Sequence, residues 1–94
     1  MGYRFNKPDR NQQEIIAALQ QIGCTVHVVN RAPFDIVVGR NGKTYILELK
    51  DGRKPPSAQA LKPSQEKFKR EWLGQWDCVN CINDAIRVVT GQQP

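Results

Sequence analysis

The stretch FDIVVGRNGKTYILELKDG, residues 34–52, decides the fold, because two apolar runs flank Asn41-Gly42. An Asn-Gly pair between two such runs is the strongest short sequence signal for a β-hairpin with a two-residue turn. In that register Arg40 faces Lys43, and every further pair along the two strands follows from this one. We therefore expect two antiparallel strands whose facing residues can be read from the sequence.

Each apolar run contains one acid, Asp35 in the first and Glu48 in the second. The hairpin register places the two acids directly opposite each other, with Cβ atoms about 5 Å apart. Lys50 shares their face of the sheet, because strand side chains alternate with a period of two residues. Two carboxylates at this separation repel each other by about 3 kcal/mol at an effective dielectric constant of about 20. A small domain that is stable by only about 5–15 kcal/mol keeps such a pair for a reason.

Three arrangements would offset this repulsion. The acids can share a proton, as in a carboxylate dyad. A basic side chain such as Lys50 or Arg31 can neutralise each of them, or the pair can hold Mg²⁺ or Mn²⁺ through oxygen ligands. A purely structural alternative has Asp35 at a loop edge and Glu48 with Lys50 facing solvent on an edge strand. A three-residue turn with a bulge at Gly42 would shift the register by one residue and separate the acids.

The rest of the chain alternates between helical and strand patterns. Helical spacing of apolar residues predicts a helix over 9–22, started by Asp9 or Asn11, and β-branched residues predict a strand over 24–29. After the hairpin, Pro55-Pro56 predicts a loop. The remaining predictions are a lead-in over 1–8, a loop over 30–33, a helix over 63–73, a strand over 76–81, a helix over 84–90 capped by Asn83, and a frayed tail over 91–94.

This order of elements predicts an α/β domain with a mixed sheet flanked by helices. The hairpin strands are antiparallel, whereas the last strand arrives by a helical crossover. Phe68 and Trp72 are spaced four residues apart on the predicted helix over 63–73, so we expect both rings to pack into the core against the sheet. The alternative is that these rings stack on the bases of a nucleic acid.

Length and composition exclude several classes of protein. With 94 residues the chain is one small domain, 1–94, and its 39% hydrophobic content fits a globular protein. No apolar run approaches the roughly 18 residues of a membrane span. The start, MGYRFNKPDR, lacks the apolar core of a secretory signal, so we expect a cytoplasmic protein. The net charge of +5 favours an anionic partner such as nucleic acid, although an ordinary solvated surface can have the same charge.

Three cysteines and one histidine form a set that on paper suits zinc, as Cys24-x-x-His27 and Cys78-x-x-Cys81. Both segments are predicted strands, in which residues three apart point to opposite faces. Neither segment contains the Gly or Pro that a zinc-binding turn usually needs. We therefore expect small, buried thiols and no zinc, and the odd number of cysteines argues against a disulfide framework.

The hairpin residues resemble the signature of a nuclease superfamily. Pro33, Asp35 and the run 48–50, Glu-Leu-Lys, resemble the P-D…(D/E)-x-K pattern of the restriction-endonuclease-like nucleases. The core of that superfamily is αβββαβ, with the first acid on the second strand and E-x-K on the third, which is the order predicted here. Phe34 is a departure, because the signature has Pro and Asp adjacent.

A narrower resemblance covers nearly the whole chain. Residues 44–75 look like the small stand-alone VRR-NUC nucleases of phages and prophages. The shared features are an E-x-K-D-G strand end over 48–52, a basic Pro-containing loop over 53–56, a [S/T]-P-x-Q-like helix start over 62–65, and a closing V-x-S/C-x-x-[D/E]-A segment over 79–85.

The resemblance implies a Mg²⁺- or Mn²⁺-dependent endonuclease that hydrolyses DNA phosphodiester bonds in a phage or bacterial host cytoplasm. Members of the group are typically homodimers, and some cut Holliday junctions or other branched DNA. The implied metal ligands are Asp35, Glu48, the Leu49 carbonyl and Glu14 in the first helix. The implied catalytic residues are these acids with Lys50, which would orient water or contact the phosphate, and Gln65. The implied nucleic-acid contacts are Arg53, Lys54, Lys62 and Lys67.

The residues implied by the resemblance also suit less specific roles. Glu14 and Gln65 also suit ordinary polar positions on helices, and each of the four cations suits plain solubility. The alternative to an enzyme is a non-catalytic nucleic-acid-binding module that retains the nuclease fold.

Overall fold

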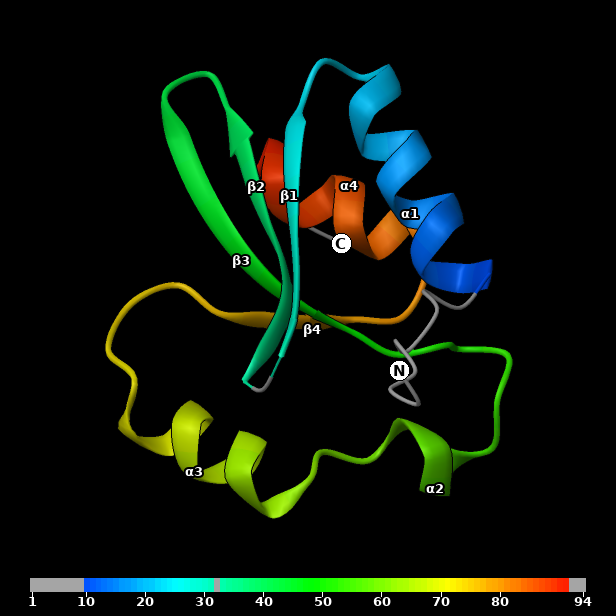
Figure 1. Cartoon of the computed structure of the whole chain (residues 1–94), viewed down its shortest axis with the longest axis vertical. Helices are drawn as coiled ribbons and strands as arrows, with labels where there is room; N and C mark the ends of the chain where they lie inside the picture. The colour runs from blue at the N-terminus through cyan, green and yellow to red at the C-terminus, as the bar shows by residue number, and fades with distance from the viewer. Residues whose placement is uncertain (1–9, 32, 92–94) are drawn as a thin grey trace, which may run out of the picture.

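A computed structural model describes residues 10–31 and 33–91 of the chain. These residues form eight elements around one sheet (Figure 1). In chain order they are α1 Arg10–Gln21, β1 Thr25–Arg31, β2 Phe34–Arg40, β3 Lys43–Leu49, α2 Pro56–Gln59, α3 Pro63–Glu71, β4 Asp77–Val79 and α4 Ile82–Thr90. The predicted lead-in over 1–8, Asp9 as a helix start, and the tail beyond residue 91 lie outside the described residues.

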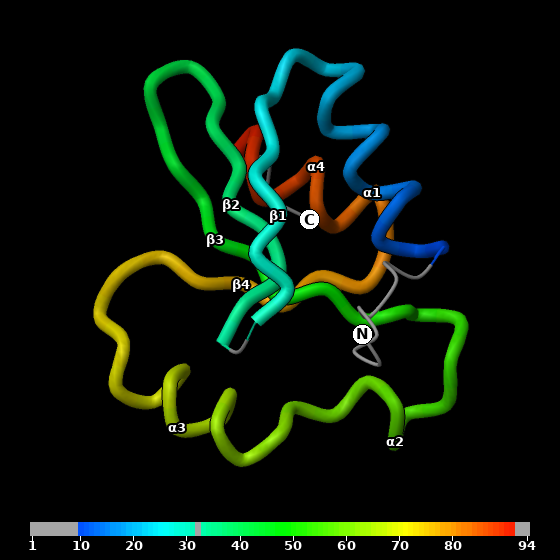
Figure 2. The backbone as a smooth tube through the Cα atoms, in the orientation of Figure 1, coloured from blue at the N-terminus to red at the C-terminus, as the bar shows by residue number. Residues whose placement is uncertain are grey.

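The sheet is mixed, with the strand order β1-β2-β3-β4. The first three strands are antiparallel neighbours, and β4 runs parallel to β3. Figure 2 shows the crossover between β3 and β4, which passes along α2 and α3 beneath the ends of the strands. The predicted α/β fold with a mixed sheet and flanking helices is therefore confirmed.

The hairpin between β2 and β3 has the predicted register. Arg40 pairs with Lys43, and the pairing continues without a shift to Ile36 and Leu47. Asn41 and Gly42 have φ angles of 50° and 77°, and a two-residue type I′ turn requires positive φ at both positions. The alternative with a three-residue turn and a shifted register is therefore wrong.

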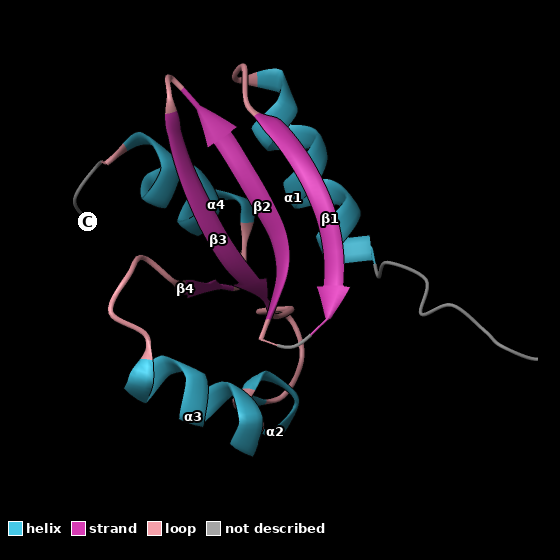
Figure 3. Cartoon of the chain, turned by 60° about the vertical axis from the view of Figure 1, so that its left-hand side comes forward, coloured by secondary structure: helices cyan, strands magenta, loops and turns pink. Residues whose placement is uncertain are grey.

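One face of the sheet is buried against α1 and α4, which lie on the same side of it (Figure 3). The alternation along the hairpin sends Ile36, Val38 and Leu47 to this face, and all three are fully buried. Two helices cover them because each helix has an apolar face. Ile15 and Leu19 come from α1, and Ala85 and Val89 come from α4.

Strand β1 is longer than the sequence pattern indicates. It continues through Arg31, where the predicted loop over 30–33 was expected. Its pairing with β2 shifts between Val28 and Arg31, and Asn30 has a φ of 53° in this interval. A bulge with Asn in the left-handed region lets the strand continue to pair across an irregularity that reads as a loop in the sequence.

Three further predictions, one loop and two helix caps, needed correction. The predicted loop after β3 contains the short helix α2, because Pro56 can occupy a first helical position, where no N–H group is needed. Helix α4 begins at Ile82 with Cys81 as the preceding cap residue, so Asn83 lies inside the first turn instead of capping it. Asn11 likewise lies inside α1 and not at its start.

The spacing of the aromatic residues on α3 predicted that this helix covers the sheet. It does not lie over the sheet. It lies across the ends of the strands, below them in Figure 1. Phe68 stacks on Trp72 with ring centroids 5.1 Å apart and contacts Trp76 at 6.2 Å. Phe68 is half-buried, but Trp72 is 46% exposed, so the expectation that both rings enter the core is wrong for Trp72.

None of the described helices is long and apolar enough to cross a membrane.

The two leucines at the extremes of exposure test this account of the core. Leu47 is fully buried and Leu73 is fully exposed. We expect Leu47→Ala to lower the free energy of unfolding by about 2–5 kcal/mol, because it leaves a cavity under two helices. The matched change Leu73→Ala should cost less than about 0.5 kcal/mol. Urea denaturation of both variants measures the difference, and equal losses would contradict the assignment of the core.

Candidate active site

The two central strands separate at the end that carries the acids. In an antiparallel ladder every second facing pair exchanges two hydrogen bonds, and Phe34 with Leu49 would be the next such pair after Ile36 with Leu47. The Leu49 amide instead donates to Asp35 Oδ2 at 2.9 Å. The Asp35 carboxylate therefore replaces a backbone acceptor, and the two strands open around it.

The second acid, Glu48, lies next to Asp35 in a buried position. Glu48 is 5% exposed, which is unusual for a glutamate. Burial raises the pKa of the Glu48 carboxyl above its ordinary value, and the negative charge of Asp35 raises it further. Asp35 therefore acts on Glu48 electrostatically, but the backbone pairing ends one pair before the two acids, so their direct opposition stays a prediction.

Lys50 and Gln65 oppose this increase in the pKa of Glu48. The Lys50 ammonium lies 3.4 Å from Glu48 Oε2, and a hydrogen bond from the Gln65 side chain also favours the ionised carboxylate. Gln65 Oε1 in turn lies 3.4 Å from Lys50 Nζ and accepts the Lys62 amide hydrogen bond at 2.9 Å. Gln65 thus joins the first turn of α3 to the acids on the sheet.

A buried amide from the first helix completes this arrangement. Asn11 is 6% exposed, and its Nδ2 donates to the Lys50 carbonyl oxygen at 2.7 Å. This contact holds the backbone of Lys50 at the point where β3 ends. The sequence indicated Asn11 only as a cap, and the available signal for its role was a polar residue on the same side of the helix as the apolar Ile15.

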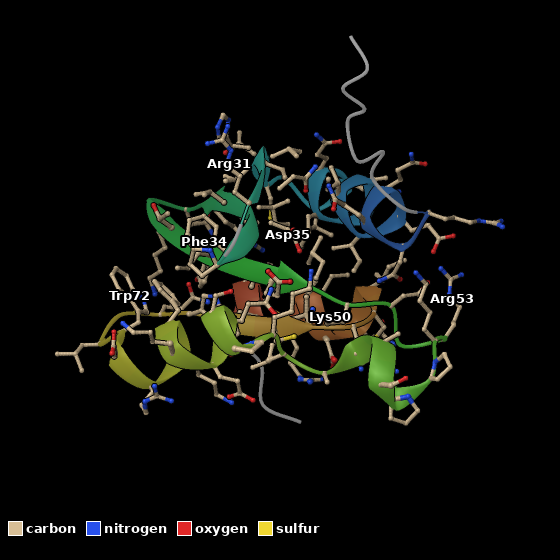
Figure 4. The ribbon with its side chains drawn as sticks, turned by 60° about the horizontal axis from the view of Figure 1, so that its bottom comes forward. Arg31, Phe34, Asp35, Lys50, Arg53 and Trp72 are labelled. Carbon is tan, nitrogen blue, oxygen red and sulfur yellow. The ribbon has the colours of Figure 1, made fainter. Side chains whose placement is uncertain are left out.

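The resulting site has more negative than positive charge. Asp35 and Lys50 project to the same region between the sheet and the crossover segment (Figure 4). Together with Glu48 they form a group of two carboxylates and one ammonium, in which both Asp35 and Lys50 interact electrostatically with Glu48. Within residues 10–31 and 33–91, no three His, Cys, Asp or Glu side chains are grouped so that they could hold a metal ion. Any ion here would therefore need ligands besides these two carboxylates.

The backbone of Leu49 offers one such ligand. The N–H and C=O groups of a strand residue point to the same side of the strand. Because the Leu49 amide points to Asp35, its carbonyl also faces the Asp35 side of β3. Two carboxylates and one carbonyl are oxygen donors of the type that Mg²⁺ and Mn²⁺ prefer, with water and phosphate oxygens as the remaining ligands.

Glu14 has different partners from those that the resemblance implies. Its carboxylate lies 3.5 Å from Arg10 and 3.6 Å from Arg53. It lines a pocket between α1, the loop after β3 and the start of α4, together with Asn11 and Asn83. No contact in the described residues joins Glu14 to Asp35 or Glu48, so its role as a metal ligand stays a prediction.

The four cations expected to contact nucleic acid are all exposed, but they differ in their partners. Arg53 is held by Asp51 at 3.0 Å, and Lys67 is held by Glu71 at 2.9 Å. Lys54 lies in the loop after β3, and Lys62 directly precedes α3. Lys69 on α3 is a further exposed cation of this basic segment, and its charge reaches the Cys78 thiol, which pairs with Glu48 across β3 and β4. Cations on α3 and its preceding loop therefore border the acid site.

The three thiols lie in separate environments. Cys24 is buried in the core, whereas Cys78 and Cys81 are exposed, so the expectation of buried thiols is wrong for these two. Cys78 faces Glu48 across the parallel pairing of β3 and β4, and Cys81 precedes α4.

Comparison of the chain with protein-family models, with curated proteins and with solved structures finds no match.

The raised pKa of Glu48 predicts how stability depends on pH. A carboxyl whose pKa is higher in the folded state lowers stability once it ionises, and this cost is absent below its unfolded pKa of about 4.5. We expect Glu48→Gln to increase the free energy of unfolding at neutral pH. The gain should shrink as the pH falls through the raised pKa and vanish near the ordinary value.

Urea denaturation across this pH range, without divalent metal, measures the effect. The control is Glu66→Gln on the exposed side of α3, which should change the free energy of unfolding by less than about 0.5 kcal/mol. A Glu48→Gln protein that is less stable than the unchanged chain at neutral pH would contradict the assignment of burial as the dominant cause.

Proposed function

We propose that the chain is a metal-dependent endonuclease that hydrolyses DNA phosphodiester bonds, of the VRR-NUC type that its sequence resembles. The observation that carries this proposal is the meeting of Asp35, Glu48 and Lys50 where β2 and β3 separate. A binding module that only contacts phosphates has no use for two adjacent carboxylates, since they repel the backbone of DNA. A cation between the acids and the phosphate removes this objection.

The donor set fits Mg²⁺ or Mn²⁺. Enzymes that act on phosphates typically bind Mg²⁺ through one or two carboxylates and complete the coordination with water and substrate oxygens. Asp35 and Glu48 would supply two carboxylates, and the Leu49 carbonyl would add a third protein ligand. An ion bound there would polarise the scissile phosphate and offset the charge that develops on it. The burial of Glu48 supports this assignment, because the cost of an ionised buried acid falls when a cation is bound beside it.

Lys50 and Gln65 would act on the attacking water and on the phosphate. The Lys50 ammonium is a donor in a largely water-excluded position, where it can orient water for in-line attack and stabilise negative charge on the phosphate oxygens. Gln65 holds Lys50 and Glu48 in their relative positions through contacts with both. Asn11 fixes the Lys50 backbone in the same way. These residues pre-organise the site, so little rearrangement is needed when the substrate binds.

DNA would lie across the exposed cations that border the acids. Lys54, Lys62 and Lys69 belong to the crossover between β3 and β4, and they would contact phosphates without reading sequence. The choice of branched DNA and the action as a homodimer are part of this proposal through the resemblance alone.

A second function is favoured by one contact. The Lys50 ammonium lies 3.4 Å from Glu48, so one acid has a positive partner without any metal. This arrangement suits a non-catalytic nucleic-acid-binding module that retains the fold. Metal binding and DNA cleavage separate the two functions.

The first experiment measures the effect of metal on stability. An ion that binds only the folded chain increases its stability, by about 2.7 kcal/mol at 100 times the dissociation constant. We expect Mn²⁺ to raise the melting temperature of the unchanged chain, and we expect Asp35→Asn to abolish that rise. Asp84→Asn, an acid on α4 paired with Arg87, is the control and should keep it. The absence of any shift with Mn²⁺ or Mg²⁺ would favour the binding module.

The second experiment measures cleavage of plasmid DNA and of a synthetic four-way junction, with and without Mn²⁺. We expect Asp35→Ala and Lys50→Ala to reduce the rate at least about 100-fold, as the loss of one charge-stabilising group does in other enzymes. Lys43→Ala is the matched control, because Lys43 lies at the opposite end of β3 and is exposed. Metal-independent cutting, or full activity in both site variants, would refute the proposal of a metal-dependent endonuclease at this site.

A further inference from the structure

A pocket between α3 and Pro33 lies near the candidate active site. It has a volume of about 250 Å³ and is lined by Pro33, Ser64, Lys67, Phe68 and Glu71. The pocket is therefore formed between Pro33, directly before β2, and one side of α3. Its volume is close to the lower end of the roughly 300–1,000 Å³ found for small-molecule sites.

Both elements that form this pocket also build the acid site. Pro33 is two residues before Asp35, and Phe68 is one helical turn after Gln65. The Pro33 carbonyl accepts a hydrogen bond from Trp76 Nε1 at 3.1 Å, which holds Pro33 against the aromatic residues beside α3. In Figure 4 Phe34 and Trp72 lie to one side of Asp35 and Lys50, whereas Arg53 lies to the other. A nucleotide chain crossing the acids toward α3 would reach the pocket within a short distance.

The lining has the chemistry that a nucleobase needs. The Phe68 ring and the Pro33 ring offer apolar surfaces, and Phe68 is already held by stacking on Trp72 at 5.1 Å. The lining also includes the Ser64 hydroxyl and the ion pair of Lys67 with Glu71, whose nitrogen and oxygen lie 2.9 Å apart. These groups offer hydrogen-bond donors and acceptors to the polar edge of a base. An apolar side chain cannot form hydrogen bonds with that edge. Single-stranded nucleic acids bind proteins through this combination of aromatic stacking and nearby positive charge.

We propose that this pocket binds one unpaired base of the DNA strand that crosses the acid site. The inference rests on the proposed binding of DNA and extends it, because it names strands with accessible bases as the preferred substrate class. A base inside an intact duplex is stacked on both faces and cannot enter the pocket. Lys67, which lines the pocket, supplies positive charge for a phosphate beside such a base.

The test compares two short fluorescent strands of equal length, an oligothymidylate and its abasic counterpart. Both carry the same phosphates, but only one has bases. Fluorescence anisotropy is measured with the full chain in a chelator, so that no cutting occurs. We expect the unchanged chain to bind the thymidine strand about 5- to 150-fold more tightly than the abasic strand, the range found for one stacked base.

Two variants test whether the pocket produces this preference. Phe68→Leu removes the stacking surface, and Ser64→Phe fills the pocket from an exposed position at the start of α3. Both should bring the ratio of the two affinities close to one while leaving the affinity for the abasic strand within about twofold, since phosphate contacts are unaffected. Ser57→Phe, the same change on exposed α2, is the control and should keep the preference. A melting curve of each variant shows that it is folded.

The outcomes separate this inference from the proposed function. A ratio near one in the unchanged chain overturns the base pocket, and so does a Ser64→Phe variant that keeps the full preference. A preference that depends on Phe68 and Ser64 supports the pocket even if the chain does not cut DNA, in which case only the nuclease proposal fails.

Discussion

The hydrogen bond from the Leu49 amide to the Asp35 carboxylate is the contact on which the candidate site depends. Without it, β2 and β3 would continue to pair through their backbones and the acids would lie on a closed sheet. With it, a side chain takes the place of a backbone acceptor, and the strands open at the end that carries the acids. The same contact turns the Leu49 carbonyl toward Asp35. It also places a negative charge near Glu48, whose pKa is raised mainly by burial and further by Asp35. Because the Asp35 carboxylate replaces a backbone carbonyl as the acceptor, the strands open, the oxygen ligands for a metal face one region, and the two carboxylates repel each other.

This conflict is stabilised by polar contacts from two helices. Gln65 is the only buried residue of α3 in the described structure, and it contacts both Lys50 and the Lys62 amide. Helix α3 is therefore held to the sheet largely through the site itself, with the aromatic contacts of Phe68 beside it. Asn11 makes the corresponding contact from α1. Buried polar groups of this kind are costly unless they are paired, so their presence here ties the position of the helices to the geometry of the acids.

The parts of this architecture that are local in sequence could be predicted, and the parts that depend on distant contacts could not. The Asn41-Gly42 turn determines its own register, and alternation then places Ile36 and Leu47 in the core and the acids on the other face. By contrast, the position of α3 depends on a crossover whose path no periodicity encodes, so Trp72 was wrongly expected in the core. Asn11 was missed for the same reason, because its partner is the backbone of Lys50, far along the chain. Glu14 was implied by the resemblance only, and its two arginine partners come from its own helix and from the loop after β3.

The central claim is that Asp35 and Glu48 together bind one divalent cation beside Lys50. A crystal of the chain soaked in Mn²⁺ tests it most directly, since the anomalous signal of manganese locates the ion without reference to the protein. The account predicts an ion that contacts both carboxylates and the Leu49 carbonyl, with Lys50 beside it and no longer the only positive partner of Glu48. An ion bound elsewhere, or an empty position between carboxylates that point apart, would contradict it.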